Sequence, residues 1–189
     1  MVHPGQRWFC RNDEEWRTLA ERLKLMPCPH CKVVGTLIRH GYLRGFDEKN
    51  NSRPKAVRGR RVFCSNRHAR SGCGRTFSVW CADKIRRLGL TTACLWRFLQ
   101  CVITNGILAA SRAIDCHLSD RTLQRIWKRF EQDQSRIRTA LFGLCPPPEL
   151  PAQPARRPAA QVLAHLRTAF PDAACPIAAF QQALHTFFV

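Results

Sequence analysis

The sequence predicts an α+β protein, with a small β module first, an all-α domain after it and a short helical segment at the C-terminal end. Two observations carry this prediction. Between about residues 26 and 82, glycine-separated segments alternate apolar and polar side chains, as half-buried β-strands do. From about Asp83 onward, apolar side chains recur every three to four residues, which is the period of a helix.

Length and charge set the first limits on function. The chain has 189 residues, enough for one ordinary domain or two small ones. Lys and Arg outnumber Asp and Glu by 31 to 13, which gives a formal net charge of +18 at pH 7. Such a charge opposes a compact state unless an anionic partner relieves it. Nucleic acid is the first partner class indicated, an acidic membrane surface is the second, and a merely solvated basic surface is the alternative.

The N-terminal residues and the cysteine content indicate the compartment. MVHPGQRWFC has no basic segment followed by an apolar run, so we expect no signal peptide. Every apolar stretch is shorter than the roughly 18 residues that a membrane span needs, so we expect no membrane association. In the cytoplasm the eleven cysteines would stay reduced, and their odd number also favours metal binding over disulfides.

The first predicted element is a helix over residues 12–24. Asn12 is placed to cap it, and Glu15 stands three residues later, as a capping box requires. One face of this helix is apolar and is assigned to packing: Trp16, Leu19 and Leu23.

The β module is expected over residues 26–82. VVGTLIRHGYLRGF (33–46) predicts a strand pair with glycine breaks, and the polar segment after it predicts a loop. VRGRRVFC (57–64) predicts a basic return strand, and RTFSVW (75–80) alternates like a half-buried strand.

Three helices are predicted next, over residues 90–106, 107–115 and 116–143. Residues suited to begin or end these helices stand at their boundaries: Thr91 or Thr92, Gly106, Ser119 and Gly143. Six prolines between residues 145 and 161 predict a linker, and two short amphipathic helices follow it. The aromatic C-terminal end is equally consistent with a partner contact and with folding back onto the helical domain. The predicted parts are therefore 1–25, 26–82, 83–143, 144–160 and 161–189.

Two cysteine pairs frame the β module. Cys28 and Cys31 enclose a Pro-His turn, the usual form of a zinc knuckle, in which both thiolates face one tetrahedral ion. The second pair, Cys64 and Cys73, is more widely spaced. The polar insert between them ends in Gly72, so it can loop out while both sulfur atoms reach the metal.

We therefore predict a structural Zn²⁺ site whose ligands are Cys28, Cys31, Cys64 and Cys73. The strand context favours zinc over iron, and Gly74 after the last cysteine suits a positive φ. A variant in which His68 replaces one cysteine stays open, as does the absence of metal, whereas His30 is expected to point outward. Six other cysteines are interpreted mainly as small buried side chains: Cys81, Cys94, Cys101, Cys116, Cys145 and Cys175.

Basic side chains crowd the same region. Between residues 53 and 87 stand eleven Lys and Arg residues, opposed only by Asp83. The planar guanidinium group donates paired hydrogen bonds to phosphate, so we predict DNA contacts from the ribbon, with a solvated basic face as the alternative. The predicted contact residues are Arg58, Arg60, Arg61, Arg67, Arg70 and Arg75.

The segment GILAASRAIDCHLSDRTLQRIWKRF has the outline of a helix-turn-helix: a short helix, a turn, and a capped longer helix. Glutamine can read adenine and arginine can read guanine in the major groove. The outward residues predicted to contact DNA are Arg121, Thr122, Gln124, Arg125 and Lys128. A three-helix bundle with a basic face is the simpler alternative.

Three motifs precede this pattern in a fixed order: CPHC at residues 28–31, VFC at 62–64 and CGRTFSV at 73–79. The order of parts resembles the N-terminal DNA-binding region of insertion-sequence transposases, over about residues 27–141. The resemblance implies a zinc ribbon followed by a helix-turn-helix that binds DNA. The second cysteine pair is wider than in most such ribbons.

The chain also differs from a transposase in the residues after Leu141. Transposase catalysis needs three acidic residues on a ribonuclease-H-like domain that holds two metal ions. The 48 residues after Leu141 contain only two acids, Glu149 and Asp172, so we predict that the chain is not an enzyme.

The predicted function is that of a non-catalytic DNA-binding protein of a transposase-related or mobile-element system, in end binding or regulation. A transcriptional regulator that uses the same module is one alternative, and an RNA-binding or assembly protein is another. The expected partner is double-stranded DNA, with a separate transposase or recombinase subunit and a second copy of the chain as further candidates. We expect a cytoplasmic, nucleoid-associated location.

Overall fold

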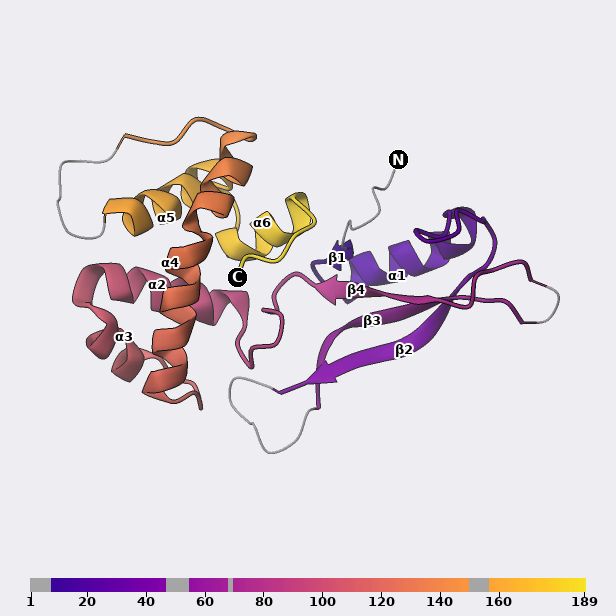
Figure 1. Ribbon diagram of the computed structural model, residues 1–189, viewed down its shortest axis with the longest axis horizontal. Coiled ribbons are helices and arrows are strands. Elements are labelled where there is room, and N and C mark those ends of the chain that lie inside the picture. The colour runs from indigo at the N-terminus through magenta and orange to yellow at the C-terminus, as the bar shows by residue number, and fades with distance from the viewer. Residues whose placement is uncertain (1–7, 47–54, 68–69, 150–156) are drawn as a thin grey trace.

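The α+β class is confirmed by the computed structural model, which describes residues 8–46, 55–67, 70–149 and 157–189. Figure 1 shows a twisted sheet with one helix against it in one half of the molecule and a group of helices in the other half. Each half has its own hydrophobic cluster.

The sheet has four strands in the order β1-β4-β3-β2, of which only β1 and β4 run parallel. The strands are β1 (Trp8–Cys10), β2 (Leu37–Gly45), β3 (Ala56–Cys64) and β4 (Thr76–Cys81). Strand β1 was not predicted, because three residues are too few to show an alternating pattern. Its partner β4 is about 70 residues away along the chain, at Trp8↔Val79.

The predicted strand pair over residues 33–46 is wrong, because the structure has one continuous strand there. The register between β2 and β3 shifts between Arg39 and Tyr42, and Gly41 in that interval has φ +111°. The glycine therefore permits a bulge instead of ending the strand, since both sides of the bulge stay paired with β3.

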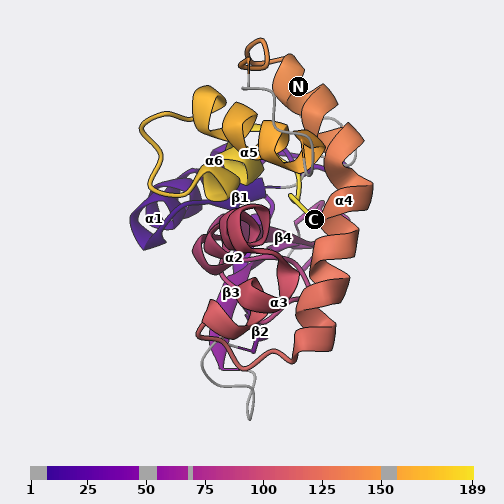
Figure 2. The same ribbon diagram turned by 90° about the vertical axis from the view of Figure 1, so that its left-hand side faces the viewer.

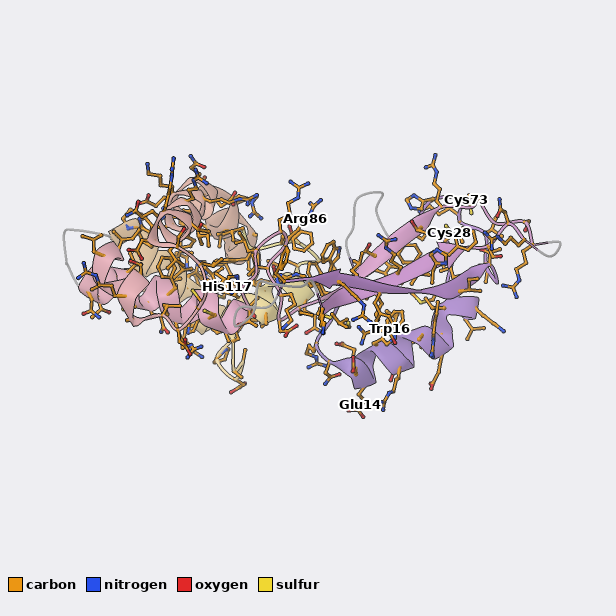
Figure 3. All side chains as sticks on the ribbon, turned by 90° about the horizontal axis from the view of Figure 1, so that it is seen from below. Glu14, Trp16, Cys28, Cys73, Arg86 and His117 are labelled. Atoms are coloured by element: carbon orange, nitrogen blue, oxygen red, sulfur yellow. The ribbon has the colours of Figure 1, made fainter. Side chains whose placement is uncertain are left out.

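Helix α1 (Asp13–Arg22) covers one face of the sheet, as Figure 3 shows. The predicted N-cap is confirmed: Asn12 Oδ1 accepts a hydrogen bond of 2.8 Å from the Glu15 N–H. A 3-10 turn, η1 (Leu23–Leu25), follows the helix. The predicted apolar face is also confirmed, because Trp16 and Leu23 belong to the buried cluster of the sheet and Leu19 packs against that cluster.

The helical half contains five helices among the described residues: α2 (Thr92–Asn105), α3 (Ile107–Ala113), α4 (Asp120–Phe142), α5 (Arg157–Ala169) and α6 (Pro176–Ala183). Figure 2 shows α4 running along one side of this half. The predicted starts of α2 and α4 are confirmed by their N-cap hydrogen bonds. The Thr91 hydroxyl accepts from the Cys94 N–H, and the Ser119 hydroxyl accepts from the Thr122 N–H. Within the described ranges, each helix is too short or too polar to cross a lipid bilayer.

The segment 161–189, predicted as a separate part, shares the core of the other helices. Phe180 and Phe188 are fully buried in the same cluster as residues of α2 and α4. The side chain of Gln181 donates to the Ala82 carbonyl at 2.8 Å and accepts from the Phe188 N–H at 3.1 Å. Of the two alternatives for the aromatic C-terminal end, the structure therefore shows the one that folds back.

The same C-terminal end joins the two halves of the molecule. The ring of Phe187 contacts Phe9 of β1 and Trp80 of β4, with centroids 5.2 and 5.1 Å apart. Gln182 donates to the Glu15 carboxylate of α1 at 2.7 Å. These contacts position the sheet relative to the helices.

Candidate metal centre and basic surfaces

The four predicted cysteine ligands lie close together. Figure 3 shows two of them, Cys28 and Cys73, toward the end of the sheet away from the helical half. The Sγ atoms of Cys28 and Cys73 are 3.8 Å apart, those of Cys31 and Cys64 are 3.7 Å apart, and all four lie within 4.8 Å of one another. Zn–S bonds of about 2.3 Å in a tetrahedron place the sulfur atoms about 3.8 Å apart, whereas a disulfide bond is about 2.0 Å long. The four cysteines can therefore hold a metal ion such as zinc.

The first cysteine pair is held by a tight backbone turn. The Lys32 N–H donates to the Cys28 carbonyl at 2.8 Å, and the Cys28 N–H donates to the Val33 carbonyl at 3.0 Å. Lys32 has φ +65°, so the chain reverses directly after Cys31. The His30 N–H donates to Cys28 Sγ at 3.4 Å, while the exposed His30 side chain is not part of the cysteine cluster.

The wide second pair is closed by Gly72. Its N–H donates to the Ser65 carbonyl at 3.1 Å, which places the residue before Cys73 beside the residue after Cys64. Cys73 then donates its N–H to Cys64 Sγ at 3.2 Å, and Gly74 has the predicted positive φ, +70°. The proposed alternative ligand, His68, lies outside the described residues.

The thiols of the first pair have opposite tendencies to ionise. Burial raises the pKa of Cys28 to about 12, whereas a hydrogen bond from the Val33 backbone lowers the pKa of Cys31 to about 7. Only the thiolate binds a metal ion. A cation at this position would offset the desolvation that opposes the thiolate of Cys28.

The six cysteines interpreted as buried side chains differ from one another. Cys94 is buried in the helical core, but Cys81, Cys101, Cys116, Cys145 and Cys175 are only half-buried. Cys81 lies opposite Cys10 in the β1–β4 ladder, and a hydrogen bond between the two thiols raises the pKa of Cys10.

We expect the substitution Gly72→Ala to weaken metal binding about tenfold, because overpacking typically costs about 1–3 kcal/mol. An added Cβ would lie 2.2 Å from the Ser65 carbonyl oxygen and 2.8 Å from Cys64 Sγ. Competition with a chromophoric chelator measures the affinity. Gly143→Ala is the matched control, because its added Cβ would meet only an ordinary contact at 3.5 Å. Equal affinity in the two variants would show that Gly72 does not position the ligand.

Two of the arginines predicted to contact DNA are buried. Arg58 is 7% exposed and donates to the carbonyls of Phe46 and Ile85. Arg60 is 8% exposed and forms an ion pair with Asp13. Both predicted contact residues are therefore engaged within the protein and little exposed to a partner.

The alternation of a β-strand explains why Arg60 is buried while Arg61 is exposed. Successive side chains of a strand point to opposite faces, so Arg60 and Arg61 cannot share one face. Arg60 faces α1, where its guanidinium group lies 6.0 Å from the Trp16 ring centroid and 4.7 Å from that of Tyr42. Val62 and Cys64, which are both buried, are two and four residues after Arg60 and so lie on the same face of the strand. This alternation in the sequence could have shown that Arg60 faces inward.

The other predicted ribbon residues are exposed: Arg61, Arg67, Arg70 and Arg75. Each of the four lies within three residues of Cys64 or Cys73 in the sequence. The guanidinium group of Arg67 lies 5.8 Å from the centroid of the Phe63 ring, and that ring also contacts His40 at 5.2 Å. This part of the sheet thus combines exposed positive charge with a partly exposed aromatic ring.

The first turns of α4 carry a second set of cations. Arg121, Arg125 and Lys128 are exposed, while Leu123 and Ile126 on the inner side are buried. The remaining two predicted contact residues, Thr122 and Gln124, are half-buried, and the Thr122 hydroxyl is 3.0 Å from the capping Ser119 hydroxyl. The helix therefore presents cations outward over about two turns.

The fold and these sites define an α+β protein with a four-cysteine cluster able to hold a metal ion and with exposed cationic side chains on two elements. Searches of protein-family models, curated proteins and solved structures find no match to the chain. The function is therefore inferred from the residues of the chain itself.

Proposed function

We propose that the chain is a non-catalytic, zinc-dependent DNA-binding protein in which α4 reads the duplex. The observation that carries this proposal is the exposed cationic start of α4, with Arg121, Arg125 and Lys128 outward and its inner face packed in the core. Helix α3 contacts α4 and precedes it by a short turn, an arrangement consistent with a helix-turn-helix. A recognition helix needs this combination of a fixed position and an exposed N-terminal end.

The cysteine cluster supports a second contact. Four cysteine ligands would leave no open coordination position, so a bound zinc would stabilise the fold and perform no chemistry. The exposed residues Arg67, Arg70 and Arg75 stand in or next to the segment that this metal site closes. A zinc ribbon would thus hold these arginines against the phosphate backbone while α4 occupies the major groove.

The distribution of acidic residues also favours one binding side. Four of the thirteen acidic residues belong to α1, and Glu14 on this helix faces away from Arg86 and Cys73 in Figure 3. DNA approaching from the side opposite α1 would avoid these carboxylates. The order of the cysteine motifs and the helix-turn-helix suggests a role at the ends of a mobile element, with a separate transposase or recombinase subunit, or a second copy, as protein partners.

A competition assay tests the proposal on zinc-loaded protein at about 150 mM salt. DNA fragments that flank the protein's own gene compete with random DNA of the same length and with duplex RNA. A preference of about a hundredfold or more for the flanking DNA is the expected result, since specific complexes exceed non-specific ones by at least that factor. Equal affinity for all DNA, or preference for RNA, would contradict DNA reading by α4.

A further inference from the structure

A small pocket lies where the helical half meets the end of the sheet. Its volume is about 270 Å³, and its lining comes from the turn after β4, from α4 and from the C-terminal end of the chain. In Figure 3, Arg86 projects between the two halves, on the side opposite Glu14 of α1. The lining residues are Arg86, Arg87, Arg129, Asp133, Arg136, Thr186, Phe187 and Val189.

One of the four arginines, Arg136, is already bound to other groups of the chain. The two Nη atoms of Arg136 donate to the carbonyls of Phe187 and Phe188 at 3.1 and 2.6 Å, and its Nε lies 3.4 Å from the Asp133 carboxylate. Arg136 thereby holds the C-terminal end in place. It also pairs with Asp133, the only acidic side chain in the lining.

The other three arginines supply positive charge to the pocket. The guanidinium group of Arg86 lies 5.3 Å from the centroid of the Phe187 ring, which orients it. Within the described part of the chain, the exposed side chains of Arg87 and Arg129 have no hydrogen-bond or ion-pair partner. Even with the Asp133 carboxylate and the α-carboxylate of Val189 counted, the four guanidinium groups leave the lining with a net positive charge, which favours a bound anion.

The backbone at Arg87 adds a separate observation. Its φ of +61° lies in the left-handed region that favours glycine. The nearest glycine in the sequence, Gly89, stands two residues later, so an arginine occupies the left-handed position. A residue in this conformation is strained, and strained residues concentrate at sites that bind ligands. Backbone conformation therefore does not explain why residue 87 is an arginine, and a role of its side chain does.

We propose that this pocket binds a phosphate group, with Arg86, Arg87 and Arg129 as its donors. Guanidinium groups donate paired hydrogen bonds to phosphate oxygens, and three arginines from two parts of the chain line this pocket. The volume lies below the roughly 300 Å³ at which drug-sized pockets begin, so it suits a small anion. The phosphate belongs either to the backbone of a bound nucleic acid or to a small phosphate compound.

Inorganic phosphate is the probe that tests the site on the full metal-loaded chain. Titration at constant ionic strength, followed by NMR of the arginine side-chain Nε–H signals, should show saturable binding. We expect Arg129→Gln to weaken binding about tenfold, because a charge-assisted hydrogen bond is removed. Arg17→Gln, an equal reduction of charge on α1, should leave the affinity unchanged. Equal phosphate affinity in these two variants, or no saturation in the unaltered chain, would overturn the proposal.

The substitution Arg87→Gly separates a binding role from a structural role. Glycine adopts a positive φ without strain, so the melting temperature of this variant should be unchanged or higher while its phosphate affinity falls about tenfold. A lower melting temperature with unchanged phosphate affinity would show that Arg87 serves the fold and would overturn its assignment as a donor.

A DNA titration then identifies the source of the phosphate. If DNA supplies it, the combined Arg87→Gly and Arg129→Gln variant should bind DNA more weakly, and the salt dependence of binding should fall by about one unit for each phosphate that is no longer bound. If DNA binding is unchanged while the variant no longer binds inorganic phosphate, the site takes a small phosphate compound. The phosphate titration does not depend on the proposal for α4, so either proposal can fail alone.

Discussion

Replacing Cys28 and Cys31 together by serine should unfold the sheet half and abolish metal binding. Structural zinc contributes on the order of 10–16 kcal/mol to the folding of small zinc domains, which is comparable to the whole stability of about 5–15 kcal/mol of a typical protein. Cys28 is fully buried and shares a hydrophobic cluster with Leu37 and Val62, so loss of the metal also exposes that cluster.

The metal content of the purified variant and the dispersion of its amide NMR signals measure this effect. We expect about one metal ion per unaltered chain and none per variant, with collapse of the signals from β2, β3 and β4. Signals from the core of α2 and α4 should persist, because those helices have a separate hydrophobic cluster. A chelator added to the unaltered chain should reproduce the same pattern.

The control for this experiment is a serine pair outside the cluster. Cys116 and Cys145 are half-buried in the helical half, so replacing both by serine should leave the metal content unchanged. A Cys28 and Cys31 variant that retains one metal ion and a folded sheet would refute the ligand assignment.

Replacing Arg121, Arg125 and Lys128 together by glutamine should lower DNA affinity about a hundredfold or more. Each direct interaction with a base or phosphate is worth about 1–3 kcal/mol, and three are removed. The three side chains are exposed, and surface substitutions of this kind usually change stability by less than about 0.5 kcal/mol. The variant should therefore fold normally and fail only in binding.

Fluorescence anisotropy with labelled duplex DNA at several salt concentrations gives both the affinity and its salt dependence. The slope of log affinity against log salt should become shallower by roughly one unit for each phosphate that the variant no longer neutralises. The matched control removes the same charge away from the first turns of α4, by replacing Arg17 and Arg22 of α1 and Arg138 near the C-terminal end of α4 with glutamine. Similar reductions of affinity in both triple variants would mean that net charge alone drives binding and that α4 is not the reader.

The elements that the sequence predicts well are those defined by neighbouring residues. The cap at Asn12 depends on the Glu15 N–H three residues away, and the cap at Ser119 depends on the Thr122 N–H at the same spacing. Each is a short-range hydrogen bond that the backbone forms whenever a helix begins there. Gly74 has its predicted positive φ, which glycine adopts readily because it lacks a Cβ.

The four cysteines of the candidate site were predictable from the sequence, whereas the set of exposed arginines around it was not. The Cys-Pro-His-Cys turn identifies the first half of the cluster, and the second pair completes it because two further sulfur atoms are needed. The basic residues of β3 were assigned as one set, although strand alternation divides them between two faces. Arg60 therefore packs between α1 and Tyr42, while Arg61 stays exposed.

By itself, then, the sequence determined the α+β class, most of the helix boundaries and the grouping of four cysteines. Only the tertiary structure decided that Trp8–Cys10 joins the sheet beside β4, that Phe188 returns to the helical core, and that Arg86 and Arg129 meet in one pocket. The physical reason is the range of the interactions. Caps and turns involve residues three or four apart, whereas these contacts join segments tens of residues apart, and their partners are selected only when apolar surfaces pack together.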